Sequence, residues 1–192
     1  MTNILAEGRV VRVGDDVNTD YIVPSHRKKE TLDPQVLRQY IFEDLSSDLA
    51  RKLEGGALLV AGTNFGCGSA MEVAVTVPKA AGVKAIVAKS FSRTFKRNAA
   101  NNGLLALTAD TTGIEEGEQG TVVERDGAIF VQMTSGKIVP CDPVPGFLLE
   151  IIRRGGLVPY LRECGDFSSP EACERHRTRD VGPHASQPPP SR

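Results

Sequence analysis

The sequence predicts an α/β fold in which a parallel sheet is flanked by helices and carries an added β-rich part. Two patterns indicate this fold. Short, fully apolar runs, which suit strands buried on both faces, alternate with helical segments in the first half of the chain. Strand signals then crowd together between residues 120 and 139. The 40% of hydrophobic and 24% of charged residues are typical of a globular protein.

The parallel part occupies the first half of the chain. GRVVRV at 8–13 predicts a strand, and a polar loop follows at 14–24. Asp33-Pro34 pairs a capping residue with a proline at the first helical position, so a helix begins there and extends to Leu45. Gly55-Gly56 interrupts the chain. Beyond it we expect strands at 57–61, 85–88 and 104–107, and helices at 72–81 and 92–101.

The β-rich part begins at residue 120. Its expected strands are 120–123, 128–132 and 137–139, and Asp126-Gly127 is typical of a hairpin turn. A last helix is expected at 146–154, ended by two glycines. Residues 165–192 hold five of the twelve prolines and few large apolar residues, so we predict a disordered tail there. The folded domain is therefore expected at 1–164.

Charge, hydropathy and cysteine usage exclude several classes of protein. The net charge of -1 argues against a nucleic-acid binder, and no apolar run is long enough to span a membrane. The N-terminus lacks a secretory signal, so a cytoplasmic, reduced protein is expected. His26 is the one histidine of the predicted domain, and the cysteines form no CxxC pair. We therefore expect no metal site in this chain.

The glycine-rich loop TNFGCGS at 63–69 is the first candidate for a functional site. It lies between a buried strand and a predicted helix, where ligands bind in open α/β sheets. Gly66 and Gly68 allow a close approach of the backbone. The amides of Gly68, Ser69 and Ala70 could bind an anion at the helix N-terminus. The alternative is a plain turn in which Ser69 caps the helix.

A second candidate is the acidic stretch DDVNTDYIVP. Its three carboxylates, Asp15, Asp16 and Asp20, lie close together with no obvious cationic partner. The alternative is that they bond to nearby backbone in Asx turns. The stretch KSFSRTFKR at 89–97 is a further candidate, since helical spacing separates its two phenylalanines from its arginines. The more common arrangement is that the phenylalanines pack in the core and the arginines face solvent. The alternative is that one arginine faces a bound anion.

A cationic run is the remaining candidate. His26, Arg27, Lys28 and Lys29 follow a proline and could together hold a substrate rich in carboxylates. The alternative is a solvated surface, which is the more common reason for consecutive charges.

Four of these motifs occur in an order that resembles one family: GDDVNTDYIVP, GTNFGCGS, GVKAIVAKSFSRTFKRNAANNGL at 82–104 and GGLVPYL at 155–161. Residues 8–163 resemble the 3-isopropylmalate dehydratase small subunit, the swivel domain of the aconitase superfamily. The resemblance implies a swivelling β/β/α domain that caps a large subunit. The large subunit would carry a [4Fe–4S] cluster, so this chain would hold no cofactor and be inactive alone. The enzyme would be a hydro-lyase of leucine biosynthesis acting on a hydroxy-carboxylate.

The resemblance also implies roles for individual residues. Ser69 would remove the proton alpha to a substrate carboxylate, with the backbone of Gly68 and Ala70 beside the substrate. Asp20, paired with Thr19, would assist proton movement at the leaving hydroxyl. The loop SHRKKET at 25–31 would set substrate choice.

The sequence departs from the family in this same region. The family's GSSREHA reads GSAMEVA at 68–74, which places Ala70, Met71 and Val73 where a serine, a carboxylate-binding arginine and a histidine are usual. The loop has the cationic run in place of an Arg-Tyr-Leu-like one. Our hypothesis is that this run takes over part of the carboxylate recognition. Isopropylmalate, dimethylmalate, homoaconitate and maleate stay open as substrates, and so does a non-catalytic assembly or regulatory subunit.

Overall fold

A seven-stranded mixed sheet forms the centre of the molecule, with the strand order β4-β3-β2-β1-β5-β6-β7. The computed structural model describes residues 2–165, so the predicted tail lies outside the described residues except for Gly165. β1 to β4 pair in parallel and β5 to β7 pair antiparallel. The strands are β1 (Thr2–Arg12), β2 (Ala57–Ala61), β3 (Val83–Ala88), β4 (Leu105–Thr108), β5 (Gln119–Arg125), β6 (Ala128–Met133) and β7 (Ile138–Pro140).

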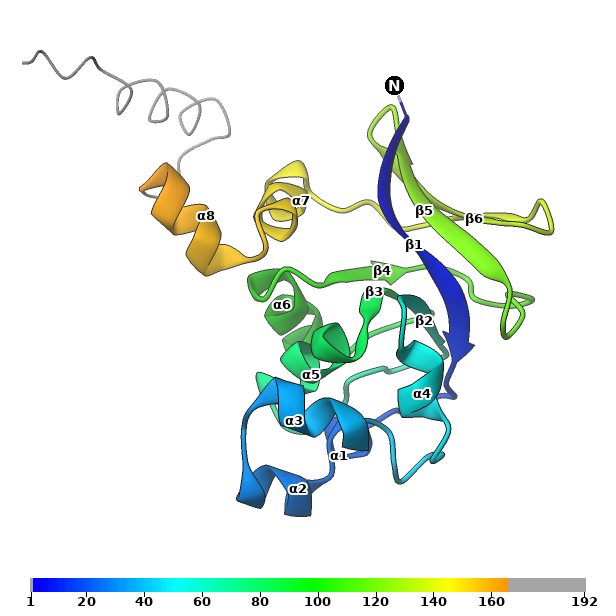
Figure 1. Cartoon of the computed structure of the whole chain (residues 1–192). Coiled ribbons are helices and arrows are strands. Elements are labelled where there is room, and N and C mark those ends of the chain that lie inside the picture. The colour runs from blue at the N-terminus through cyan, green and yellow to red at the C-terminus, as the bar shows by residue number, and fades with distance from the viewer. Residues whose placement is uncertain (1, 166–192) are drawn as a thin grey trace, which may run out of the picture.

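Helices cover the parallel part and fill the connections (Figure 1). This arrangement confirms the predicted α/β class with its added β-rich part. Within residues 2–165, no helix combines the length and the apolar composition that crossing a membrane requires. The helices are α1 (Thr19–Ile22), α2 (Ser25–Glu30), α3 (Pro34–Leu37), the 3-10 turn η1 (Arg38–Tyr40), α4 (Leu49–Leu53), α5 (Val73–Ala81), α6 (Arg93–Asn101), α7 (Gly146–Arg153) and α8 (Leu157–Cys164).

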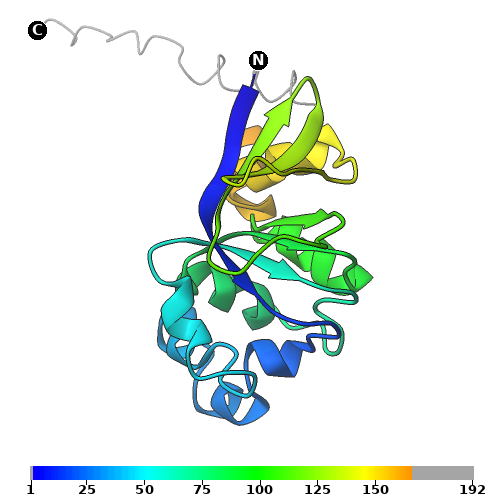
Figure 2. The same cartoon turned by 90° about the vertical axis from the view of Figure 1, so that its right-hand side faces the viewer.

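The long strand β1 joins the two parts of the sheet. Its C-terminal end, Arg9–Arg12, pairs in parallel with β2, and Thr2–Arg9 pairs antiparallel with β5. A shift of register between Ile4 and Ala6 marks an irregularity in the second pairing. Figure 2 shows β1 running from the end of the molecule that carries α7 and α8 to the end that carries α1 to α4.

Two apolar cores lie on opposite faces of the parallel strands. Successive side chains of β2 point to opposite faces, so Leu59 belongs to one core and Leu58 and Val60 belong to the other. The first core also contains buried residues of α3, α5 and α6. The second contains Val131 of β6 and Leu149 of α7. The antiparallel strands and α7 therefore cover the face of the parallel strands that is opposite to α3, α5 and α6.

The short helices depart from the sequence prediction. The expected polar loop at 14–24 contains α1, the cationic run forms α2, and the helix predicted from Asp33 to Leu45 shortens to α3 and η1. Neither α4 nor α8 was predicted. These helices have three to eight residues, too few for a hydrophobic periodicity to identify them. Local caps stabilise two of them: the side chain of Asn18 accepts from the Asp20 amide and that of Asp33 from the Gln35 amide.

The buried leucine at the middle of β2 provides a stability test. Leu59 is fully buried in the first core, so Leu59→Ala should lower the free energy of unfolding by about 2–5 kcal/mol. Ile138 in β7 is 58% exposed, and Ile138→Ala should change that free energy by no more than about 0.5 kcal/mol. Urea denaturation measures both values, and equal losses would contradict this assignment of the core.

Candidate active site

The loop that follows β2 is fixed on one side by the loop that follows β1. Asp15 accepts hydrogen bonds from the Thr63 amide at 2.6 Å and from its hydroxyl at 3.0 Å. These bonds lower the pKa of Asp15. Asp16 accepts from the Asn64 side chain at 2.8 Å. A side chain at Gly62 would collide with Asp15, since its Cβ would lie 1.9 Å from Oδ1.

Aromatic packing fixes the other side of the loop. The Phe65 ring makes edge contacts with Phe91 and Phe95, at centroid distances of 6.0 and 5.1 Å. The Ser92 hydroxyl donates to the Gly66 carbonyl at 2.6 Å. Gly66 has a φ of +74°, and a Cβ there would lie 2.2 Å from the Phe95 ring. The core interpretation of these phenylalanines is confirmed, and Arg93 and Arg97 are exposed.

The tip of the loop lies against the start of α1. The Thr19 amide donates to the Cys67 carbonyl at 2.8 Å. Gly68 has a φ of +101°, and a Cβ there would lie 2.5 Å from Asn18 Oδ1 and 3.0 Å from Thr19 Oγ1. Thr19 is only 2% exposed, and its backbone amide holds the loop tip. Glycine is therefore required at position 68 for both conformation and space.

Ser69 follows this tip and faces solvent. It does not cap a helix, because α5 begins at Val73 and its capping residue, Glu72, makes no side-chain cap. The capping alternative for Ser69 is therefore wrong. Within residues 2–165, the amides of Gly68, Ser69 and Ala70 donate no hydrogen bond, and the Ser69 hydroxyl makes none. Three amides and a hydroxyl are thus free beside one another for an anionic ligand.

A compact polar group contacts Met71, two residues beyond Ser69. The Lys28 ammonium contacts Asp20 Oδ1 at 2.6 Å and Met71 Sδ at 3.3 Å. Ser25 donates to the same Asp20 oxygen at 2.8 Å. Bonds from Lys28, then from Ser25, hold the pKa of Asp20 below its usual range, so the carboxylate is ionised. The structure thus brings Asp20, Lys28 and Met71 together from separate segments.

The other members of the cationic run have different surroundings. Arg27 makes a bidentate ion pair with Glu43, with N–O distances of 2.9 and 3.1 Å. Its guanidinium carbon also lies 3.8 Å from the centroid of the Tyr40 ring. His26 Nε2 lies 3.4 Å from the same carboxylate. Lys29 is exposed. Arg27 therefore anchors α2 to the η1 segment, and only Lys28 of the run contacts the Ser69 region.

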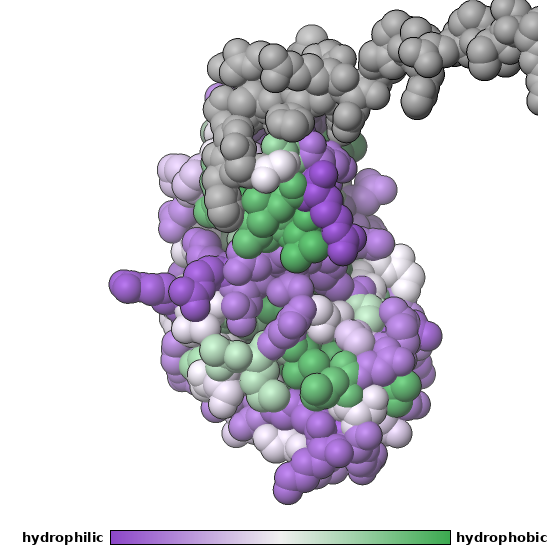
Figure 3. Space-filling model, turned by 90° about the vertical axis from the view of Figure 1, so that its left-hand side faces the viewer, coloured by the Kyte–Doolittle hydropathy of each residue, from purple (hydrophilic) through white to green (hydrophobic). Residues whose placement is uncertain are grey.

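An apolar hollow of about 440 Å³ lies beside Met71. On the face seen in Figure 3, hydrophobic side chains gather in two groups, one over the α7–α8 end and one over the α3–α5 end. Leu32, at the rim of the hollow, is 62% exposed. The lining residues are Leu32, Pro34, Ala70, Met71, Glu72, Val73 and Thr76.

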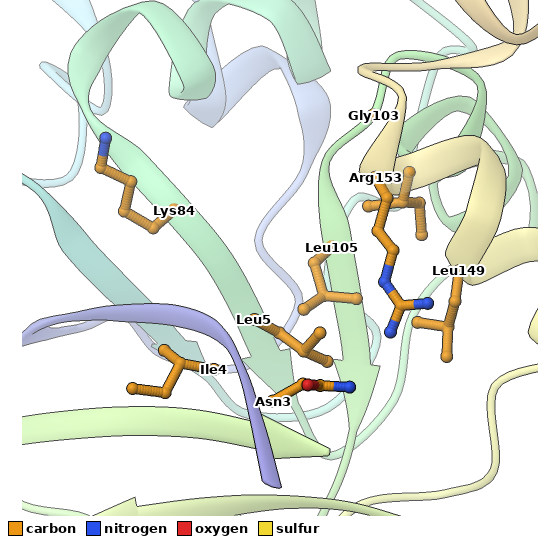
Figure 4. A pocket seen from close by; sticks show the side chains of 9 residues that line it. Asn3, Ile4, Leu5, Lys84, Gly103, Leu105, Leu149 and Arg153 are labelled. Carbon is orange, nitrogen blue, oxygen red and sulfur yellow. The ribbon is translucent and has the colours of Figure 1, made fainter. Parts of the chain in front are cut away.

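A cavity of about 380 Å³ lies at the opposite end of the parallel strands (Figure 4). Leu5, Leu105 and Leu149 point into it, and Arg153 lies at its rim. Leu105 is the first residue of β4, whereas the Ser69 loop follows the last residue of β2. This cavity is therefore remote from the candidate site.

The structure separates the three carboxylates of the acidic stretch. Asp15 and Asp16 bond to the next loop, not to their own backbone as an Asx turn would require, whereas Asp20 faces Lys28. Sequence reasoning missed Asn18, whose side chain caps α1 and contacts the space beside Gly68. An Asn just before a Thr-Asp pair was a recognisable capping signal. It also missed Glu43, for which the sequence carried no comparable signal.

Comparison with known proteins identifies the family. The family model of the aconitase C-terminal domain matches residues 28–112. A 3-isopropylmalate dehydratase small subunit of Caldanaerobacter subterraneus is 42% identical over 159 residues, which cover 82% of this chain and 98% of that protein. The chain belongs to the family of 3-isopropylmalate dehydratase small subunits. A second member, small subunit 1 of Thermotoga maritima, is 39% identical over 165 residues and covers 85% of this chain and 98% of its own length.

The fold of this family agrees with the present structure. The crystal structure of a 3-isopropylmalate dehydratase from Methanocaldococcus jannaschii superposes with a TM-score of 0.75 at 34% identity. The match covers 95% of this chain and all of that one. The family membership predicted from the four ordered motifs is thereby confirmed.

Gly68→Ala tests the packing at the loop tip. The substitution should displace Ser69 and reduce turnover in the assembled enzyme at least about 100-fold, since small misplacements of reacting groups have costs of this size. Gly136→Ala is the matched control, because Gly136 has a φ of +88° and a Cβ added there would have no atom within 4 Å. Backbone strain from the positive φ alone would lower the free energy of unfolding, measured by urea denaturation, equally in both variants. Equal turnover in the two variants would contradict the collision at position 68.

The Arg27–Glu43 pair predicts a pH dependence. Arg27 lowers the pKa of Glu43, so the pair stabilises the fold above the unfolded pKa and is lost as pH falls through the folded one. Glu43→Gln should therefore lower the urea midpoint at pH 7, and the difference from the native chain should shrink below about pH 4.5. Glu54→Gln, an exposed carboxylate, should have a much smaller effect at pH 7. A difference that grows in acid would contradict the ion pair.

Proposed function

We propose that this chain is the small subunit of a two-subunit hydro-lyase that dehydrates and rehydrates a 2-hydroxy dicarboxylate, with isopropylmalate as the leading substrate. The observation that carries the proposal is the exposed Ser69 hydroxyl beside three unpaired amides, on a loop fixed from both sides. The names of the relatives support the same reaction. They do not favour a non-catalytic assembly subunit, and a cytoplasmic location agrees with the proposal.

The described residues do not fit an iron–sulfur cluster. Cys67 and Cys141 lie in different segments, and residues 2–165 contain no group of three His, Cys, Asp or Glu side chains placed to bind a metal. We therefore assign a [4Fe–4S] cluster to a large subunit that docks on this chain. Bound there, the cluster would supply Lewis-acid polarisation of the substrate hydroxyl.

This chain would contribute proton transfer and charge stabilisation. Ser69, as the alkoxide, takes the proton from the carbon alpha to a carboxylate and becomes the neutral hydroxyl, which leaves the negative charge on the carboxylate oxygens. The free amides of Gly68 and Ala70 point hydrogen-bond donors at that charge, as an oxyanion hole does. Asp20, ionised beside Lys28, positions the leaving hydroxyl by accepting its hydrogen bond, and a proton from solvent lets that hydroxyl leave as water. Thr19 contributes by holding the loop tip.

The surroundings of Ser69 support a substrate that is both anionic and apolar. The cationic α2 offers Lys28 beside Asp20, whereas Arg27 and His26 lie at Glu43. The hollow beside Met71 is large enough for a branched alkyl group. Ser69 and Gly68 are exposed on this chain, so a partner surface must exclude water before the proton is removed.

Ser69→Ala tests the proposed function in the reconstituted two-subunit enzyme. Loss of the hydroxyl should reduce turnover of isopropylmalate by about 100- to 10,000-fold, which is the usual contribution of general acid–base catalysis. Formation of the unsaturated product is followed by its ultraviolet absorbance. Ser47→Ala, an exposed serine outside the site, is the control and should retain native turnover. A fully active Ser69→Ala complex of native composition would refute the proposed function.

A further inference from the structure

Lys28 is a cation that the fold has withdrawn from water. Its side chain is 7% exposed, although it belongs to a short surface helix with no buried residue. Burying an ammonium is unfavourable unless anionic or strongly polar partners replace the lost water. The partners that Lys28 has are therefore informative about its role.

The partners present do not use the full capacity of the ammonium. It carries three N–H donors. Asp20 accepts one of them at 2.6 Å, and the Met71 thioether, a weak acceptor, lies at 3.3 Å. No other acceptor for Lys28 occurs among residues 2–165, and Ser25 shares the Asp20 oxygen that Lys28 uses. One further anionic oxygen would complete its coordination.

The position of Lys28 brings this donor to the Ser69 turn. The Met71 amide donates to the Ser69 carbonyl at 2.9 Å, which closes a tight turn over residues 69–71. The Met71 side chain then extends to the Lys28 ammonium, and Met71 also lines the apolar hollow. The cation and the hollow therefore both border one side chain, two residues beyond Ser69.

We propose that Lys28 binds a carboxylate of the substrate beside Ser69 and thereby determines specificity for dicarboxylates. This inference rests on the proposed function and assigns the recognition to one residue of the cationic run. Asp20 and Met71 orient the ammonium. Because Met71 Sδ touches that ammonium, a longer cationic side chain at position 71 would bring its charge to the same place.

The test uses the assembled enzyme and the unreactive inhibitor 2-isopropylsuccinate. Lys28→Met keeps the apolar stem and removes the charge. It should raise the KM for isopropylmalate and the Ki of the inhibitor about 10- to 100-fold, as loss of a charged hydrogen bond predicts, with a smaller change in kcat. Lys28→Met with Met71→Arg should recover most of this loss. Lys84→Ala, at the opposite end of the strands, should leave both constants unchanged.

Two monoamides of 2-isopropylsuccinate separate binding from a purely structural role. The native enzyme should bind one monoamide at least tenfold more weakly than the diacid, and the Lys28→Met enzyme should discriminate little between them. A structural ion pair with Asp20 would leave this discrimination unchanged, and that result would overturn the inference. Should Lys28→Met fail to assemble, Met71→Arg in the native chain should tighten diacid binding several-fold, and an unchanged Ki would overturn it. An inactive Ser69→Ala enzyme with unaltered Lys28→Met kinetics would reject this inference alone.

Discussion

The site depends on how tightly the loop after β2 is held between its two neighbours. Asp15 accepts hydrogen bonds from the amide and the hydroxyl of Thr63. Phe65 makes edge contacts with the rings of Phe91 and Phe95. These contacts hold the loop tip against Asn18 and Thr19, where only glycine fits at position 68. An otherwise exposed serine thus acquires a fixed position. Precise placement of this kind is what a proton transfer requires.

Charge in this region serves two separate purposes. Asp15, Asp16 and the Arg27–Glu43 pair connect backbone segments, and their partners are all within the fold. Asp20 and Lys28 form a pair that contacts Met71, two residues beyond Ser69. The structural pairs hold the loops and the helix from which the proposed site is built. Under the proposed function, the same residue types serve both as structural contacts and in the reaction within a short stretch of sequence.

Long, regular features were predictable from the sequence, and short or distant ones were not. The apolar runs of β2 and β3 and the Asp126-Gly127 hairpin follow from local patterns. The single turns α1 to α4 depend on caps and on tertiary burial, which periodicity does not reveal. The glycine loop was found by its composition, and the catalytic role of its Ser69 stays a prediction. The contact between Lys28 and Met71 joins residues 43 positions apart, so no local pattern could indicate it.

The continuity of β1 has a mechanical consequence. One strand is hydrogen-bonded along Thr2–Arg9 to the antiparallel part and along Arg9–Arg12 to the parallel part, so neither part can rotate without breaking that ladder. Hinge bending between the two parts of the sheet would therefore have a high energetic cost, because it would break hydrogen bonds of β1. Under the proposed function, any movement of this chain over a substrate would therefore displace the whole domain as one body.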